Sequence, residues 1–204
     1  AIITTFISDY IFPSILRGAE AQLAAAGAEF CCLVPASASL FEFYRARGYQ
    51  KAFGLREVCR PIRRNLWSQA DFDSVTAKAL LDLRRRFCPD SVTLTLGGMV
   101  RVLTDLYSGG LTIVSDPDGY GLYFQHGDEL EVIELFAEGD RAAERLLEAA
   151  RDKTGAETAR ITLGHAQPLF LGEGKPMDYG MIHFLAQPFP VEESYMRLML
   201  DNEG

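Results

Sequence analysis

The sequence predicts an α+β fold, with a mixed sheet between helices in three layers and with two domains. Three observations support this prediction. A strand–helix–strand pattern opens the chain, three closely spaced strands and an amphipathic helix fill its second half, and a basic stretch around Pro61 separates the two patterns. With 204 residues, 48% of them hydrophobic, the chain is long enough to bury two small cores. We expect domains at residues 1–64 and 65–204.

The first domain alternates strands with helices. β-Branched and aromatic residues favour strands, apolar residues three and four apart favour helices, and Gly27 and Gly48 are typical helix ends. The apolar run at residues 29–34 is typical of a strand buried on both faces. The expected elements are a strand at residues 1–7, a helix at 12–26, a strand at 29–34, a helix from Ser37 or Ser39 to about Arg47, and one or two strands within 49–62. Because the chain starts directly in a strand, we expect this domain to be incomplete at its N-terminus.

The second domain contains an antiparallel meander. Turn-forming residues at 116–119 and 127–129 separate three strands, and Asp140 and Gly155 bound an amphipathic helix. The expected elements are helices at residues 71–87, 99–107, 140–154 and 193–200, and strands at 91–96, 111–115, 121–126, 129–136, 157–163 and 179–186.

Charge and hydropathy exclude several kinds of partner. The net charge of −8 argues against an extended basic surface for nucleic acid or anionic lipid and suits a cationic substrate. No apolar stretch approaches the roughly 18 residues that a membrane span needs. We therefore expect a cytoplasmic protein with no nucleic-acid or membrane partner, and a homo-oligomer remains open.

The cysteines and histidines show no metal-binding spacing. We expect the four cysteines, Cys31, Cys32, Cys59 and Cys88, to be reduced and mostly buried. His126, His165 and His183 are far apart in the sequence and belong to no ligand motif, so we expect no metal site.

The informative motif is the segment Phe43-Tyr44-Arg45-Ala46-Arg47-Gly48-Tyr49, which follows a buried strand, a turn and a helix. It resembles the second conserved segment of the Gcn5-related N-acetyltransferases (GNAT family), a helix that ends F/L-Y-x-x-x-G-F/Y. The resemblance implies a GNAT-like mixed sheet, acetyl-CoA as cosubstrate, and Tyr44 as the general acid that protonates the departing thiolate. The alternative is that Tyr44 only packs beside Leu40 and Phe43.

The same resemblance implies a set of cofactor-binding residues. Ser37 stands seven residues before Tyr44, where many family members carry an asparagine that contacts the pantetheine arm. The implied set is Phe6, Ile7, Ile11, Phe12, Ser14, Ser37 and Arg47.

The family's phosphate-binding R/Q-x-x-G-x-G/A segment has no counterpart in this sequence. Tyr10 and Phe12 fall on its glycine positions, where a β-carbon would keep phosphate away. We expect a glycine-rich segment of about four residues to be missing between Tyr10 and Ile11, because such a loop is mobile without its anion. The alternative is a true deletion that abolishes cofactor binding.

The second domain resembles a degenerate copy of the same fold. Glu138 and Asp140 flank the start of a helix where pyrophosphate would bind, so we expect no cofactor site there. The arrangement resembles the tandem aminoglycoside and peptide-lysine acetyltransferases of the enhanced intracellular survival type.

Two functions remain after the motifs are weighed. The first is an N-acetyltransferase acting on an unidentified small-molecule or peptide amine, which Glu42 or Asp178 could orient. The second is a non-catalytic binding or sensor module on a GNAT scaffold. An unrelated α+β carrier requires the match at residues 43–49 to be chance.

Overall fold

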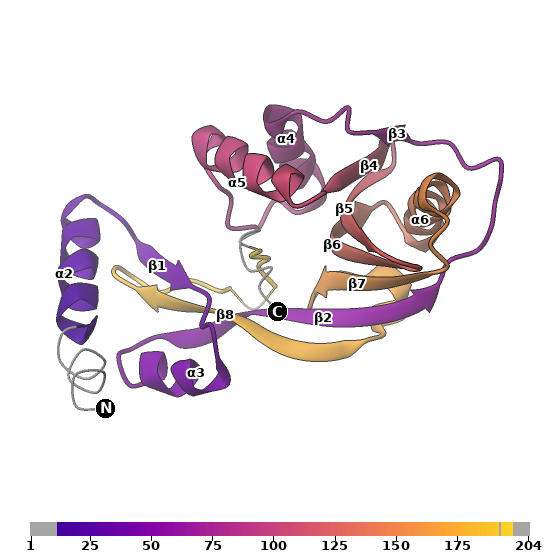
Figure 1. Cartoon of the computed structure of the whole chain (residues 1–204). Helices are drawn as coiled ribbons and strands as arrows, with labels where there is room; N and C mark the ends of the chain where they lie inside the picture. The colour runs from indigo at the N-terminus through magenta and orange to yellow at the C-terminus, as the bar shows by residue number, and fades with distance from the viewer. Residues whose placement is uncertain (1–11, 192, 198–204) are drawn as a thin grey trace. The chain divides into compact units, whose positions relative to one another are not determined.

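The computed structural model describes residues 12–191 and 193–197, and its chain divides into two compact units (Figure 1). The first unit comprises residues 1–52 and 179–191, and the second comprises residues 53–178 and 192–204. Strands β2 (Gln50–Pro61) and β8 (Lys175–Phe184) contain residues of both units. A boundary between packing units need not be a boundary between domains, so domains at 1–64 and 65–204 remain a prediction.

In the described part of the first unit, two helices accompany an antiparallel strand pair. Its further elements are α2 (Phe12–Ala25), β1 (Phe30–Leu33) and α3 (Ala38–Arg45). Strand β1 pairs with β8 from Phe30 opposite Phe184 to Leu33 opposite Met181. These elements confirm the predicted helices and the strand at 29–34 to within a few residues, but the β1 side chains are half-buried. The expected burial on both faces was wrong, because β1 pairs on one side only among the described residues. The strand predicted at residues 1–7 lies outside the described residues.

The second unit is a sheet with helices on both faces. Its strands follow the order β2-β7-β6-β5-β4-β3, and every pair is antiparallel except β6–β7. The elements are β3 (Asp71–Phe72), α4 (Ala77–Phe87), α5 (Leu96–Ser108), β4 (Thr112–Asp116), β5 (Gly119–His126), β6 (Glu129–Ala137), α6 (Asp140–Thr154), β7 (Thr158–Gly164) and the 3₁₀ turn η2 (Leu169–Gly172). The predicted meander and the predicted mixed sheet are confirmed.

A bulge in β6 directs its side chains to two different helices. The register between β5 and β6 shifts between Leu122 and Tyr123, so that Ile133 is the extra residue on β6. Consequently Val132 and Leu135 both join the apolar core under α6, while Glu134 contacts Arg84 of α4. Since adjacent strand residues point to opposite faces, α4 and α6 cover opposite sides of the sheet (Figure 1).

Glu134 is the centre of a buried polar network. Its exposed fraction is 0% and that of Arg84 is 1%. The carboxylate accepts hydrogen bonds from Arg84 Nε at 3.0 Å, the Tyr120 hydroxyl at 2.9 Å and the Tyr195 hydroxyl at 3.0 Å, and Arg84 donates a second, shorter bond. Burial, and then the nearby Glu134, raise the pKa of both phenols, so they stay protonated and can donate. The network is therefore fully paired.

Three predicted elements were wrong. Instead of a helix at 71–87, the chain forms β3, turns at Asp73 (φ +53°) and begins α4 after Thr76, whose hydroxyl accepts from Ala79 N. Instead of a strand at 91–96, only Ser91 forms a bridge, to Tyr195, and Thr95 caps α5. The described residues 193–197 of the predicted helix at 193–200 are not helical. In each case a capping side chain or a long-range contact outweighs local apolar spacing.

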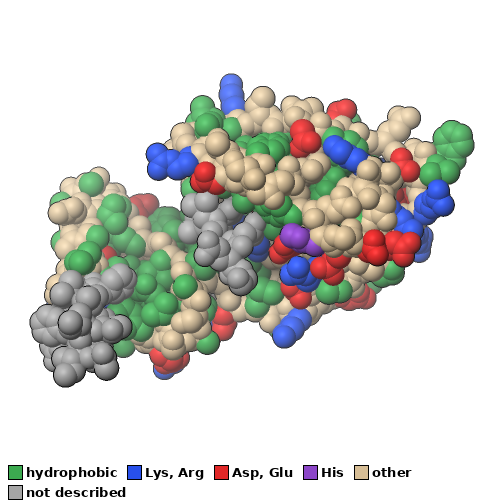
Figure 2. Space-filling model, in the orientation of Figure 1, with side chains coloured by type: hydrophobic (Ala, Val, Ile, Leu, Met, Phe, Trp, Pro, Cys, Tyr) green, Lys and Arg blue, Asp and Glu red, His purple; other side chains and the backbone are tan. Residues whose placement is uncertain are grey.

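Among the described residues, no helix is both long and apolar enough to span a membrane. Acidic and basic side chains are mixed over the face shown in Figure 2, so the net negative charge forms no single patch there.

Removing the Glu134 charge should strongly destabilise the second unit. Glu134→Gln leaves Arg84 buried without a counter-charge, and we expect a loss of about 3–5 kcal/mol in the free energy of unfolding by urea denaturation. The matched control is Glu138→Gln, whose partner Arg86 is 2.6 Å away at the surface, where a loss below about 1 kcal/mol is expected. Equal losses in the free energy of unfolding for the two variants would show that the buried Glu134–Arg84 pair contributes no more than the exposed Glu138–Arg86 pair.

Candidate functional site

The Phe43 to Tyr49 motif forms the C-terminal end of α3. Gly48 adopts a left-handed conformation (φ +92°). Tyr49 N donates to Tyr44 O at 3.2 Å and Gly48 N donates to Arg45 O at 3.1 Å, which is the Schellman arrangement that closes a helix. The rings of Tyr44 and Tyr49 are 5.6 Å apart, as the apolar contact of this motif requires. The motif therefore positions Tyr44 in the last turn of the helix.

Gly48 also makes room for His183 of β8. A β-carbon on Gly48 would lie 2.8 Å from His183 Cε1. The imidazole Nδ1 is 2.9 Å from Gly48 O, and its ring lies 5.1 Å from that of Tyr49. A glycine is thus needed at this position both for its backbone angle and for the approach of the imidazole.

Tyr44 is half-buried and keeps its proton. Burial raises the pKa of its hydroxyl, which the Arg47 guanidinium partly opposes. The Tyr44 ring packs edge-on against Phe43 at 5.3 Å. A protonated, partly desolvated phenol is the state that a general acid requires at neutral pH.

Tyr49 is anchored by a different contact. Its hydroxyl donates to Glu20 Oε1 of α2 at 2.8 Å. Burial, followed by this hydrogen bond, raises the pKa of Tyr49. Neither Glu20 nor His183 was predicted, because no spacing in the sequence links α2 or β8 to the end of α3.

The predicted cofactor residues are only partly described. Phe6, Ile7 and Ile11, together with the expected interruption between Tyr10 and Ile11, lie outside the described residues. Phe12 begins α2, and Ser14 lies exposed in its first turn.

Ser37 and Arg47 lie at opposite ends of α3. Ser37 occupies the N-cap position, but its hydroxyl is 3.0 Å from that of Ser39 and caps no backbone amide. Arg47 donates to Phe43 O at 2.6 Å, and its guanidinium carbon is 3.4 Å from the centroid of the Phe43 ring. Ser37 is thus accessible to a ligand, whereas Arg47 is engaged with its own helix.

In the second unit, a loop of the chain itself covers the start of α6. Asp140 Oδ1 accepts from Phe170 N at 2.6 Å, and the Phe170 side chain is buried in the core beneath α6. Arg56 holds this loop by donating to Gln167 O and Leu169 O, both at 2.7 Å, and also to Glu173 O. The start of α6, which the sequence analysis compared with a phosphate-binding helix start, is therefore covered.

The opening between β6 and β7 is also filled. These parallel strands pair only from Glu129–Thr158 to Val132–Ile161 and then separate. Gln167 bridges the separated parts, because its Nε2 donates to Leu135 O at 3.0 Å and its Oε1 accepts from Gly164 N at 2.5 Å. The backbone groups that an extended ligand would pair with are thus bound by a side chain of the protein.

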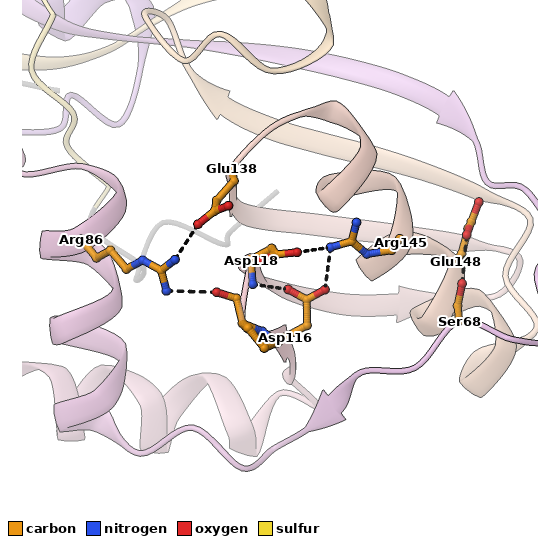
Figure 3. A network of polar contacts seen from close by, with 8 residues as sticks. Ser68, Arg86, Asp116, Asp118, Glu138, Arg145 and Glu148 are labelled. Atoms are coloured by element: carbon orange, nitrogen blue, oxygen red, sulfur yellow. Dashed lines mark hydrogen bonds and ion pairs between the residues drawn. The ribbon is translucent and has the colours of Figure 1, made fainter.

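Two acidic residues close to the start of α6, Glu138 and Asp118, are paired with arginines (Figure 3). Glu138 bonds Arg86 at 2.6 Å, and Asp118 bonds Arg145 at 2.5 Å. Glu138 therefore does not approach the α6 start as a free carboxylate.

The described cysteines are free, and no group of three or more His, Cys, Asp or Glu residues in the described part of the chain could hold a metal ion. Cys59 is exposed and Cys31, Cys32 and Cys88 are only partly buried, so the expectation of mostly buried cysteines was wrong. Cys59 lies on the face of β2 opposite Val58, which packs in the α6 core.

Solved structures with the same fold include GCN5-related N-acetyltransferases. One from Kribbella flavida has a TM-score of 0.59 at 18% identity, covering 83% of this chain and 47% of its own. Eis1 from Mycobacterium abscessus has a TM-score of 0.61 at 16% identity, covering 87% and 52%. One from Anabaena variabilis has a TM-score of 0.63 at 13% identity, covering 89% and 52%.

These comparisons establish the fold. The chain has a GNAT fold and spans about half the length of the solved structures it matches. No family model and no curated protein matches the sequence.

Gly48→Ala should destabilise the first unit more than Gly27→Ala does. Both glycines have positive φ, but nothing lies within 4 Å of a β-carbon at Gly27, so only the backbone cost of about 1–2 kcal/mol applies there. The excess at Gly48 comes from His183 and should disappear in a His183→Ala background, as measured by thermal unfolding in a double-mutant cycle. An excess that persists without His183 would contradict this explanation.

The second unit should bind no acetyl-CoA of its own. Because both the α6 start and the β6–β7 opening are occupied, calorimetric titration of the full-length protein should give no more than one site per chain. Electron density for a coenzyme A molecule beside Asp140 would overturn this expectation.

Proposed function

We propose that this chain contributes part of an N-acetyltransferase centre, which moves an acetyl group from acetyl-CoA to an unidentified amine with Tyr44 as general acid. The GNAT fold and the motif at residues 43–49 support the proposal. The observation that carries it is the half-buried Tyr44, held at the end of α3 with its pKa raised by burial.

Tyr44 would act as the thioester breaks. The amine attacks the acetyl carbonyl, and the thiolate that departs is a better leaving group once it is protonated. The Tyr44 hydroxyl holds a proton at neutral pH and would donate it to this sulfur. The opposing positive charge of Arg47 limits the rise in pKa, which favours release of that proton.

Ser37 is the described residue best suited to contact the pantetheine arm. Its exposed hydroxyl can both donate and accept, and among the described residues it contacts the neighbouring Ser39 alone. Glu42, one of the two carboxylates named as able to orient the amine, is paired with Arg45 on the exposed face of α3. The base that deprotonates the amine is therefore left unassigned.

A non-catalytic binding or sensor module is the second candidate. This candidate is favoured because the motif already has a full structural explanation. Gly48, Tyr44 and Tyr49 end helix α3, and that role requires no catalytic activity. Calorimetric titration of acetyl-CoA into the full-length protein separates the two functions. Micromolar binding followed by acetylation of added amines supports the enzyme, whereas binding without turnover across an amine panel supports the module.

Replacing Tyr44 with Phe should lower the acetylation rate constant by about one to a few orders of magnitude, because the proton donor is lost. Acetyl-CoA affinity should change little. The matched control is Tyr49→Phe, which removes the hydroxyl bonded to Glu20 and should reduce stability rather than turnover. An unchanged rate in the Tyr44→Phe variant would show that Tyr44 only packs and is not the general acid.

A further inference from the structure

The turn after β2 displays two large apolar side chains. Trp67, the only tryptophan in the sequence, is 90% exposed, and Leu66 is 64% exposed. We call residues 63–68 the tryptophan turn. It lies entirely within the second unit, between β2 and β3 (Figure 1).

Hydrogen bonds hold the tryptophan turn in one conformation. Asn65 Nδ2 and the Ser68 hydroxyl donate to Glu148 of α6 at 2.8 and 2.9 Å, and Figure 3 shows the second of these contacts. Asn65 Oδ1 accepts from Trp67 N at 3.1 Å. The exposed indole therefore projects from a fixed support, so little ordering entropy would be lost when it binds.

A groove begins where the tryptophan turn ends. Its volume is about 650 Å³, within the range of roughly 300–1,000 Å³ typical of ligand pockets. Three carboxylates and one ammonium group line it, those of Asp71, Asp116, Asp152 and Lys153, and apolar surface comes from Ala70, Phe72 and Ala149.

The turn and the groove carry opposite charges that are not paired within the described chain. Arg63 and Arg64 are exposed and form no ion pair among the described residues, and the same is true of Asp71 and Asp152 in the groove. Asp116 bonds Arg145 at 3.5 Å, and Lys153 lies 3.7 Å from Asp73. The groove therefore keeps two carboxylates available for a basic, apolar partner.

We propose that two copies of this protein associate about a two-fold axis, each placing its tryptophan turn in the acidic groove of the other. A two-fold interface requires a surface that is complementary to itself, and the adjacent turn and groove provide one. Trp67 supplies the central anchor, and Arg63 and Arg64 meet Asp71 and Asp152 of the second copy.

The turn cannot fill its own groove, because Asn65 and Ser68 fix it to Glu148. An anionic membrane is a poorer match for the exposed indole, since the net charge of −8 opposes approach to such a surface. A second copy offers the complementary charges together with an apolar surface for the indole.

The single tryptophan makes its emission a direct reporter of this contact. Sedimentation in the analytical ultracentrifuge should show dimers whose fraction increases with protein concentration. The buffer contains about 0.15 M salt, so that charges farther apart than about 8 Å are screened. The Trp67 emission maximum should shift to shorter wavelength over the same concentration range. Trp67→Ala should weaken the dimer roughly 10-fold or more, whereas Leu171→Ala, which removes another side chain that is 89% exposed, should leave it unchanged.

A charge exchange tests the pairing itself. The variant Arg63→Glu/Arg64→Glu places acidic turns against acidic grooves, and Asp71→Lys/Asp152→Lys places basic turns against basic grooves. Each variant alone should be monomeric, and an equimolar mixture should form a heterodimer in which both contacts are complementary again. Recovery on mixing also shows that each variant is folded.

Several results would overturn the proposal. These are a wild-type protein that stays monomeric, a Trp67→Ala variant that dimerises as the wild type does, or no association when the two charge variants are mixed. A short-wavelength emission that does not depend on concentration would mean that the same chain covers Trp67. A shift caused only by anionic phosphatidylserine vesicles would assign the turn to a membrane instead.

Discussion

The structure of the second unit depends on keeping one buried carboxylate fully paired. Glu134 meets side chains from α4, from β5 and from the segment that carries Tyr195, so three parts of the chain converge on one pair of oxygens. In a low-dielectric interior, a missing partner would leave a costly unpaired charge. The β6 bulge is what allows this carboxylate to face α4 while Val132 and Leu135 fill the core beneath α6. The extra residue Ile133 therefore determines both the direction of the β6 side chains and the pairing of Glu134.

The candidate site illustrates how one sequence pattern serves two purposes. Gly48 and the two tyrosines close a helix with standard backbone bonds, and the same closure fixes the position of a protonated phenol. A helix end is a stable place for such a group because its backbone is already constrained on both sides. The structural and the chemical account of Tyr44 are thus compatible, and only a measurement of turnover distinguishes them.

Local signals in the sequence were sufficient for some elements and not for others. Helix α6 begins at Asp140 and ends at Thr154 as expected, because its apolar period is regular and Gly155 closes it in a left-handed conformation. The antiparallel meander was predicted correctly from the turn-forming residues between its strands. By contrast, β3 has two residues and exists only through its pairing with β4, so no period could reveal it. The contact between His183 and Gly48 joins residues 135 positions apart, and the site was incompletely predicted for that reason.

The side chain of Gln167 has a thermodynamic consequence for the second unit. A protein domain whose opening is filled by a ligand gains stability by mass action, so its melting temperature follows the ligand concentration. Here the filling group belongs to the same chain and is present at a constant effective concentration. The stability of the second unit therefore does not depend on a ligand at this opening. A unit that fills this opening with its own side chain keeps the same stability whether or not a small molecule is present to occupy it.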